Sequence, residues 1–464
     1  MPFYSSLGEG EQKLLDYVEQ TLNEQAASLQ ALVKIPSVKA EPEGGMPFGK
    51  QMQLALDEAL ALGKRLGFKT RDLDGYAGVV DYGEGEEMLG ILAHLDIVPA
   101  GDGWTMEPFG GQLSDGKIYG RGTLDNKGPA VSALYALAAI AASGIPLKRR
   151  VRIILGCDEE SGWACMEHYK KHERLPELSF SPDGMYPLVY SEKAVLQMKF
   201  SRALSHSQIR LSAGERSNVV PGTARAVLKA SLVPNSFPEI EGFKTSLTYE
   251  GEYATLLVTG LGAHASTPEE GKNALLMLIQ LLNTLPLEGE DALIIKTLAE
   301  AFKMDLHGES LGIDAEDESG RLTLNPGVIS WNEEQVSLKL DSRLPHSITS
   351  EHVIKSVSHA LKAAGFMLSA TSTHPAHLVP LESELVKKLL GVYRTQSGDY
   401  ASKPLAVGGG TYARAMGNSV AFGPEWPGKP LLAHMPDEYI SLEDMKKNTL
   451  IMADAIASLA GEQS

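Results

Sequence analysis

Residues 88–99 of the chain read MLGILAHLDIVP, and this stretch decides how the rest of the sequence is interpreted. Residues 90–93 are a short apolar run of strand length, with Pro99 closing the segment. His94 and Asp96 lie two positions apart, so on an extended backbone their side chains project to the same side. We therefore expect a buried strand whose end carries an imidazole and a carboxylate. The alternative is a core histidine beside a turn-forming aspartate.

The composition is that of a globular protein large enough for two or three domains. The chain has 464 residues, of which 43% are hydrophobic and 22% are charged. Its net charge of −17 argues against nucleic acid and against an anionic membrane surface, because both partners require clustered Lys and Arg. We therefore expect neither partner.

Cysteine usage and the N-terminal stretch predict a cytoplasmic location. The chain has two cysteines, Cys157 and Cys165, which are too few for a disulfide framework and suit a reducing compartment. The N-terminal stretch MPFYSSLGEGEQ lacks the basic and apolar regions of a signal peptide. No apolar run reaches the roughly 18 residues that a membrane span needs.

Carboxylates recur where two further strands are expected to end. The apolar run at residues 150–156 is followed by Asp158, Glu159 and Glu160. A short strand within residues 178–184 ends in Asp183. Three consecutive carboxylates repel one another unless they are solvated or bound to cations, so a solvated loop is the alternative. Sites of α/β proteins lie at the carboxyl ends of strands, which favours the cation interpretation.

Asp125 and His434 are the remaining candidates. Asp125 follows a glycine-rich loop at residues 99–124 and lies just before a helix predicted over residues 130–143. An N-cap or turn residue is the alternative for Asp125. His434 lies far along the chain, in a loop after a strand predicted at residues 420–423.

Two histidines and three carboxylates, one of them shared, are the ligands expected of two divalent cations in one site. Imidazole and carboxylate without thiolate suit zinc, manganese or cobalt. One of the adjacent acids Glu159 and Glu160 can be a ligand, while the other takes a proton from water and passes it to the leaving amine. Asp96 is better placed to fix the His94 ring than to bind a cation.

The pattern changes between residues 192 and 380. Strand-like runs at residues 195–200, 226–233, 253–260 and 336–343 alternate with helical stretches at residues 271–285 and 352–364. This alternation predicts a second, α+β domain inserted into the first.

The fold class that we expect is α/β, with a mixed sheet flanked by helices and interrupted by the inserted domain. Helical periodicity predicts the first two helices at residues 9–33 and 49–66. The expected domain bounds are residues 1–190 plus 381–464 for the catalytic domain and residues 191–380 for a lid that binds substrate.

Seven motifs together resemble one known family. They are HLDIVPAG at residues 94–101, GRGTLDNKG at 120–128, DEESG at 158–162, SPDG at 181–184, SNVVPG at 217–222, GAHAS at 262–266 and GGGTYA at 408–413. This set resembles the di-metal exopeptidase clan, which includes aminoacylases, carboxypeptidases, desuccinylases and carnosinase-like dipeptidases. The resemblance covers nearly the whole chain and is closest to the bacterial dipeptidase V (PepV) type.

The resemblance implies a ligand for each metal position. His94 and Asp183 would hold one cation, and Glu160 and His434 would hold the other. Asp125 would bridge the two cations. The implied cofactor is therefore a pair of divalent ions, zinc or manganese, with cobalt as a further candidate.

The resemblance also implies roles for residues around the metals. Glu159 would be the general base and then the general acid, and the peptide bond after Asp125 would have an unusual geometry. His264 would reach the oxyanion of the tetrahedral intermediate, which is a known use of such donors. Asn218 and Arg343 would bind the substrate carboxylate, although a surface arginine beside an aspartate is the alternative for Arg343. The remaining residues assigned to substrate binding are Gly409, Gly410 and Thr411.

The function that these expectations favour is a metal-dependent dipeptidase acting on short peptides with free ends, through a metal-bridging water and a glutamate base. One chain is long enough to supply both halves of the lid, so we expect a complete site in a monomer. A deacylase of N-acyl amino acids, or a succinyl-diaminopimelate desuccinylase, would share every metal ligand. A non-catalytic module that binds metal or peptide is the alternative of another class, although binding alone needs no general base.

Overall fold

The structure is a computed structural model and describes residues 9–461, so most of the N-terminal stretch compared with signal peptides lies outside it. The chain divides into two compact units. Unit 1 comprises residues up to Tyr190, then Leu378–Leu405, and the chain from Thr411 onward. Unit 2 comprises Ser191–His377 and Ala406–Gly410. The chain thus leaves unit 1 and returns to it, and each unit has its own sheet.

The helices of unit 1 are α1 (Glu9–Val33), α2 (Lys50–Arg65), α3 (Lys127–Ser143), α4 (Ala164–His172), α8 (Glu384–Ser397), the short 3₁₀ helix η4 (Tyr412–Ala415) and α9 (Leu442–Ala460). Its strands are β1 (Lys69–Leu73), β2 (Ala77–Tyr82), β3 (Met88–His94), β4 (Gln112–Ser114), β5 (Lys117–Tyr119), β6 (Arg150–Gly156), β7 (Leu178–Ser181), β8 (Gly184–Met185), β22 (Ser419–Ala421), β23 (Pro424–Glu425) and β24 (Tyr439–Ser441). Three strands span the points at which the chain passes between the units, namely β9 (Val189–Glu192), β20 (His377–Leu378) and β21 (Leu405–Val407).

The helices of unit 2 are α5 (Ala274–Leu282), α6 (Gly289–Phe302), α7 (Ser350–Lys362) and the 3₁₀ helices η1 (Ala230–Leu232), η2 (Pro268–Glu270) and η3 (Glu309–Leu311). Its strands are β10 (Ala194–Ala203), β11 (Arg210–Ala213), β12 (Thr223–Lys229), β13 (Lys244–Glu250), β14 (Tyr253–Thr259), β15 (Glu316–Asp317), β16 (Gly320–Arg321), β17 (Thr323–Trp331), β18 (Gln335–Leu344) and β19 (Met367–His374).

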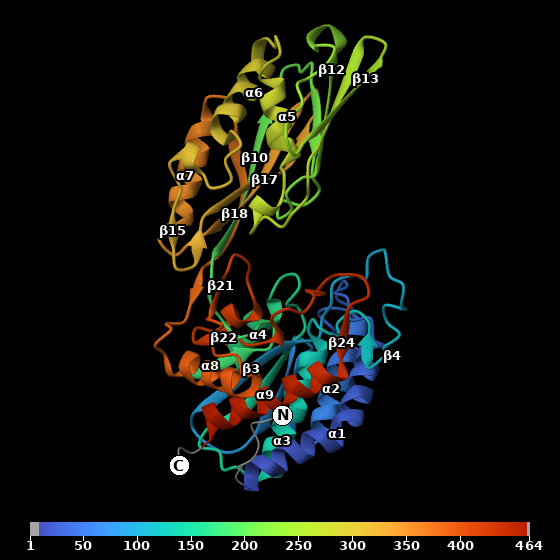
Figure 1. Ribbon diagram of the computed structural model, residues 1–464, viewed down its shortest axis with the longest axis vertical. Coiled ribbons are helices and arrows are strands. Elements are labelled where there is room, and N and C mark those ends of the chain that lie inside the picture. Colours follow the sequence, from blue (N-terminus) through green and yellow to red (C-terminus); the bar gives the residue numbers. More distant parts are fainter. Residues whose placement is uncertain (1–8, 462–464) are drawn as a thin grey trace. The chain divides into compact units, whose positions relative to one another are not determined.

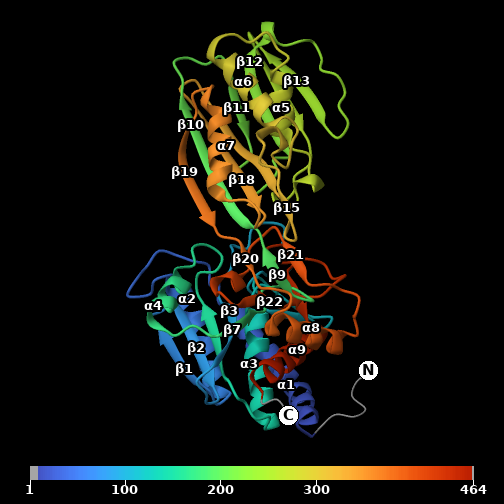
Figure 2. The same ribbon diagram turned by 90° about the vertical axis from the view of Figure 1, so that its left-hand side faces the viewer.

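The sheet of unit 1 is mixed, and its centre is parallel (Figure 2). Strand β3 pairs in parallel with both β6 and β7, and β22 pairs in parallel with β7. The edge strands β1 and β2 are antiparallel. The predicted mixed α/β fold is therefore confirmed. Its central apolar runs form parallel strands, which in such folds are covered on both faces.

Helices cover both faces of this sheet. On one face Gly78 of β2 lies against Leu56 and Leu60 of α2. On the other face Arg152 of β6 bonds to Tyr169 of α4. Helices α1, α3 and α9 pack against one another, and α3 is buried almost throughout (Figure 1). The predicted helices at residues 9–33 and 49–66 are confirmed.

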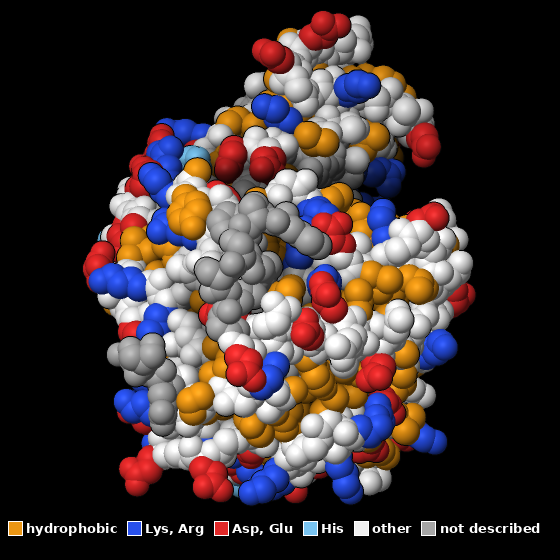
Figure 3. All heavy atoms as spheres, turned by 60° about the horizontal axis from the view of Figure 1, so that its bottom comes forward, with side chains coloured by type: hydrophobic (Ala, Val, Ile, Leu, Met, Phe, Trp, Pro, Cys, Tyr) orange, Lys and Arg blue, Asp and Glu red, His pale blue; other side chains and the backbone are white. Residues whose placement is uncertain are grey.

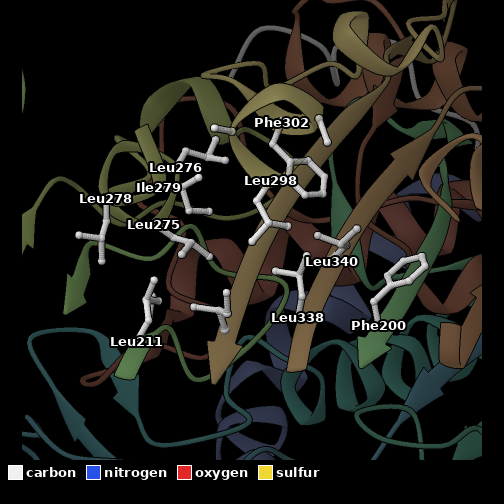
Figure 4. Packing of buried hydrophobic residues seen from close by; sticks show 14 of the residues in the cluster. Phe200, Leu211, Leu275, Leu276, Leu278, Ile279, Leu298, Phe302, Leu338 and Leu340 are labelled. Atoms are coloured by element: carbon white, nitrogen blue, oxygen red, sulfur yellow. The ribbon is translucent and has the colours of Figure 1, made fainter. Parts of the chain in front are cut away.

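The sheet of unit 2 is antiparallel, in the order β13-β14-β12-β11-β17-β18-β10-β19. Alternate residues of its strands pack under helices α5, α6 and α7, and Figure 4 shows part of this core, with Leu211 and Leu338 from strands facing Leu275 and Leu298 from helices. The strand predicted at residues 226–233 is shorter than expected, because residues 230–232 turn into η1. The sequence prediction also missed helix α6.

On the face in Figure 3, basic side chains are scattered among acidic ones, which is the pattern of an ordinary solvated surface. Cys157 and Cys165 are both buried and free. Within residues 9–461 no helix is long and apolar enough to cross a membrane.

Candidate metal centre

His94 is the last residue of β3 and lies wholly buried among carboxylates. Its Nε2 is 3.0 Å from Oδ1 of Asp125 and 3.6 Å from Oδ1 of Asp183. Asp183 follows β7, the parallel neighbour of β3, so the two strands deliver their polar residues at one edge of the sheet. The arrangement predicted from apolar runs followed by polar residues is thus present in space.

His434 approaches the same carboxylate from the C-terminal part of the chain. Its Nε2 is 3.0 Å from Oδ2 of Asp125 and 3.0 Å from Oε1 of Glu160. The two oxygens of Asp125 therefore meet two different imidazoles. His94 comes from the end of β3, and His434 comes from a loop far along the chain. Asp125 does not cap α3, whose N-cap residue is Asn126.

The donor set fits divalent cations. Two groups of three side chains have ligand atoms within 4.8 Å of one another: His94, Glu159 and Asp183 form one, and His94, Asp125 and Glu160 form the other. Imidazole nitrogens and carboxylate oxygens are the donors that zinc and manganese accept. These are the two such groups within residues 9–461.

The electrostatics of the cluster also favour positive charge. Hydrogen bonds to Asp125 and Glu160 raise the pKa of His434 to about 10. Burial lowers the pKa of His94, but its bonds to Asp125 and Asp183 outweigh burial and hold that pKa well above its usual value. Burial raises the pKa of Glu159, and the charge of Asp183 raises it further. The cluster therefore favours the positively charged form of the two imidazoles and disfavours an additional negative charge on Glu159.

Asp96 contacts the His94 ring, as expected, and it also contacts the two glutamates. Nδ1 of His94 bonds to the backbone carbonyl of Asp96 at 3.0 Å, whereas the Asp96 carboxylate is 3.5 Å away. That carboxylate instead accepts the backbone N–H groups of Glu159 at 3.0 Å and Glu160 at 2.9 Å. Asp96 therefore fixes the ring of His94 through its main chain and fixes the two glutamates through its side chain.

The first of the three consecutive acids, Asp158, is structural. Its buried carboxylate accepts bonds from Lys39 Nζ at 2.7 Å, from Ser161 Oγ at 2.6 Å and from the Ala164 N–H at 3.0 Å. These bonds tie the turn after β6 to the first residue of α4. Glu159 and Glu160 are left to face the cluster.

Asn126 joins two of the ligand loops. The peptide bond between Asp125 and Asn126 is cis, which confirms the unusual geometry expected there. The Asn126 amide donates to the carbonyl of Pro182 at 2.6 Å and to Oδ1 of Asp183 at 3.3 Å. The loops before α3 and after β7 are thereby held together.

The lid residues predicted from the sequence gather within unit 2. Val219, next to Asn218, forms a bridge with His264, and the Asn218 carbonyl accepts the N–H of Ala265 at 2.9 Å. Arg343 on β18 is 5% exposed and donates through Nε to Oδ1 of Asp341 at 2.7 Å. The alternative of a surface arginine is therefore wrong, because Arg343 is buried, although it is paired with the aspartate that this alternative named.

The glycine-rich loop belongs to the same cluster. Nη1 of Arg343 donates to the carbonyl of Gly408 at 3.1 Å. A Cβ on Gly408 would lie 2.8 Å from Cβ of Ser266, so that position has no room for a side chain. Gly409 and Gly410 belong to unit 2, whereas Thr411 is in unit 1, where its side chain accepts the N–H of Ala413 at 3.2 Å.

Three charged residues near the metal centre were missed by the sequence analysis. Arg121 and Glu438 form a buried ion pair between the loops of Asp125 and His434. Burial, together with the charges of Asp125 and Asp183, raises the pKa of Glu425 to about 7. Glu425 ends the short strand β23, four residues beyond β22, so no apolar run directly before it could have identified it.

Comparisons with known proteins agree with this geometry. The model of peptidase family M20/M25/M40 matches residues 90–458. The Bacillus subtilis (strain 168) protein named "Putative dipeptidase YtjP" is 38% identical over 451 residues, which cover 93% of this chain and 96% of that protein.

Two solved structures share the fold. Human carnosine dipeptidase 1 matches with a TM-score of 0.59 at 15% identity, over 97% of this chain and 98% of that one. The Bacillus subtilis YXEP protein, described as a dinuclear metal binding peptidase, matches with a TM-score of 0.53 at 10% identity, over 95% and 99%.

Proposed function

Because the chain belongs to peptidase family M20/M25/M40 and is a metal-dependent dipeptidase, we propose that it removes the N-terminal residue from short peptides with two free ends. The observation that carries the proposal is the position of Asp125 between two imidazoles. One carboxylate oxygen is 3.0 Å from His94 and the other is 3.0 Å from His434. A carboxylate shared in this way is what a dinuclear centre requires.

We assign the ligands from these contacts. His94 and Asp183 would hold one cation, Glu160 and His434 would hold the second, and Asp125 would be shared between the two. Zinc and manganese are the proposed ions, with cobalt as a substitute, because the donors are imidazole and carboxylate without thiolate. When bound, such a pair polarises the scissile carbonyl and lowers the pKa of water.

Glu159 is the proposed general base. It lies among the ligands, since its carboxylate forms a three-residue group with His94 and Asp183. Asp96 holds the backbone N–H groups of both glutamates, so that the two side chains keep separate positions. Glu159 takes the proton of the attacking water and delivers it to the leaving amine.

His264 is the proposed oxyanion donor. The backbone N–H of Ser266 donates to Nδ1 of His264 at 3.2 Å, and the Ser266 hydroxyl lies 2.6 Å from the same nitrogen. Since a backbone amide can only donate, Nδ1 must accept, and the ring proton lies on Nε2. Burial and the charge of Arg343 lower the pKa of His264, which favours this neutral form. A neutral ring with a free Nε2–H is a suitable donor to a developing oxyanion.

Arg343 and Asn218 are the proposed partners of the substrate carboxylate, and Gly409, Gly410 and Thr411 line the backbone of the peptide. The guanidinium of Arg343 is held by Asp341 and Gly408, so it is oriented before substrate arrives. We further propose that one chain carries every group named here and acts as a monomer. The two buried free thiols favour a cytoplasmic location.

A substrate panel tests the proposal. Metal-stripped protein is given zinc or manganese and assayed with α-dipeptides, carnosine, a tripeptide, an N-acetyl amino acid and N-succinyl-diaminopimelate. We expect dipeptide cleavage that returns with metal. Cleavage of the acylated substrates alone would assign the chain to the deacylases, and binding of two ions without turnover would favour a binding module.

A further inference from the structure

A buried ion pair links the loop of Asp125 to the loop of His434. Arg121 is 1% exposed and Glu438 is fully buried, and Nη1 of Arg121 donates to Oε2 of Glu438 at 2.6 Å. Both residues belong to unit 1. Removing two charges from water is costly, so a pair kept in such a place calls for a structural reason.

The carboxylate of Glu438 holds the loop of Asp125. Its Oε1 accepts the backbone N–H groups of Gly122 at 3.0 Å, Leu124 at 2.8 Å and Asp125 at 3.1 Å. Successive amides that converge on one anion form a well-defined concave turn. The main chain of Asp125 is therefore fixed at the residue whose side chain reaches both imidazoles.

The guanidinium of Arg121 holds the loop of His434. It donates to the carbonyls of His434 at 3.1 Å, Met435 at 3.2 Å and Ala100 at 3.1 Å. His434 has a φ of 64°, a left-handed conformation that non-glycine residues seldom adopt. Such a conformation persists where surrounding contacts enforce it, and the fork of an arginine can satisfy several carbonyls at once.

Strand pairing brings the two loops together. Tyr439 of β24 lies opposite Tyr119 of β5, and the Gly120 N–H donates to the carbonyl of Glu438 at 2.9 Å. The loop that holds Asp125 begins where β5 ends, and the loop that holds His434 ends where β24 begins. The ion pair then continues the contact from the strands to the two ligands.

We propose that Arg121 and Glu438 are positioning residues, which hold Asp125 and His434 at the spacing that one cation requires. The inference rests on the proposed function, in which both residues are metal ligands. Groups that orient ligands from behind typically change metal affinity by about 10- to 100-fold when they are replaced. The pair touches neither the cation nor the substrate in this scheme.

The test is Glu438→Gln in the full chain, stripped of metal and titrated with Mn²⁺ by calorimetry. The amide keeps the size of the side chain but removes the charge opposite Arg121, and it places an NH₂ donor against either the guanidinium or the backbone N–H groups. We expect the affinity for one Mn²⁺, the ion assigned to Glu160 and His434, to fall by about 10- to 100-fold. Arg121→Lys is the second variant, because it keeps the charge but cannot reach four acceptors.

Glu173→Gln is the matched control. Glu173 accepts bonds from Arg152 at 2.6 Å and from Arg71 at 2.8 Å, so it is also paired with arginine in unit 1, yet these two partners lie on β6 and β1 rather than in a ligand loop. We expect this variant to lower the unfolding temperature and to leave both Mn²⁺ affinities unchanged.

Three outcomes decide the inference. A selective loss of Mn²⁺ affinity in Glu438→Gln or in Arg121→Lys supports it. Wild-type affinity in both folded variants, with a lower unfolding temperature like that of Glu173→Gln, would overturn it. His434→Ala separates this failure from failure of the proposed function: if that variant still binds two Mn²⁺ with wild-type affinity, the ligand assignment is wrong, and the inference falls with it.

Discussion

The sheets of the two units bury their strands in different ways. Strands β3 and β7 of unit 1 are buried at every position, and helices cover both faces. Strands β12 and β14 of unit 2 alternate between buried and exposed positions, and β19 is exposed throughout. A parallel sheet covered on both sides leaves charged side chains room mainly at the strand ends, whereas a half-covered antiparallel sheet accepts them along its length.

This difference explains where the metal centre lies. Of the groups in the metal centre, His94 ends β3, Glu159 and Glu160 follow β6, and Asp183 follows β7, all at one edge of the sheet. The lid residue Arg343 of unit 2 lies inside β18, in a run from Leu340 to Leu344 that is buried at every position, beyond the alternating first half of the strand. A charged residue at the end of an apolar run therefore identifies a candidate site in unit 1, whereas Arg343 follows no apolar run.

The largest expected effect is that of Glu159→Ala. If the strand-end acids divide into ligands and a base, this variant should lose about 10²- to 10⁴-fold in kcat, which is the usual contribution of a general acid–base group. The metal content should stay at two ions per chain, because the ligands are other residues. Steady-state kinetics together with elemental analysis measure both quantities.

Asp158→Asn is the control for this prediction. Asp158 is adjacent in sequence but bonds to Lys39, Ser161 and Ala164 rather than to the cluster. We expect lower stability with kcat retained. Wild-type kcat in Glu159→Ala would remove Glu159 from the role of base, and equal kinetic loss in both variants would show that position in the turn matters more than the side chain.

The strand ends of unit 1 are also the part that the sequence predicts best. The apolar runs and the residues at their ends indicated His94, the adjacent pair Glu159 and Glu160, and Asp183. Asp125 and His434 were candidates from loops, and the structure brings both beside His94, Glu160 and Asp183. Periodicity reports burial along one element, so it could find these groups without knowing how the strands pair. It could not find partners that depend on a long-range contact.

Arg121 and Glu438 illustrate the limit. They lie 317 positions apart, and only the pairing of β5 with β24 makes them neighbours. The roles of Asp96 are hidden for the same reason, because its carboxylate bonds to backbone N–H groups 63 and 64 residues away. Backbone acceptors leave no pattern of side chains in a sequence.

A smaller effect is expected when the charge of Arg343, which lies inside β18 of unit 2, is removed. Arg343→Met should raise KM for dipeptides by about 10- to 100-fold, since a hydrogen bond to a charged group contributes about 1.5–3 kcal/mol. The KM for C-terminally amidated dipeptides should change little. Because KM does not depend on the amount of folded enzyme, the ratio of the two KM values reports carboxylate recognition rather than a general change in the site.

The buried Asp341 requires its own control. Removing Arg343 leaves that carboxylate without its cation, so Asp341→Asn is combined with Arg343→Met. Asp341→Asn alone should leave the preference for free carboxylates largely in place. Equal KM changes for free and amidated substrates would remove Arg343 from carboxylate recognition, and β18 would then hold an ordinary structural ion pair.

The smallest expected effect is that of Asp454→Asn on the free energy of unfolding. This variant tests whether a buried negative charge in unit 1 is destabilising when it lies away from the strand ends. Asp454 lies on α9, one of the packed helices, and burial raises its pKa to about 6 from the usual 3.8. The native state therefore binds a proton more tightly than the unfolded state, and stability falls as pH rises from about 4 to 6. Asp454→Asn removes this penalty, which is at most about 3 kcal/mol.

The expected result for Asp454→Asn is a higher free energy of unfolding at pH 7.5, with the gain shrinking as pH falls below 6. Urea unfolding at several pH values measures it. Asp16→Asn is the matched control, because Gln12 bonds to Asp16 much as Gln396 bonds to Asp454, but on the exposed side of α1. If Asp454→Asn were less stable at pH 7.5, ionised Asp454 would be a stabilising group. A buried charge on a covering helix would then be as well tolerated as one at a strand end, and the contrast between the two positions would not explain why the metal centre lies where it does.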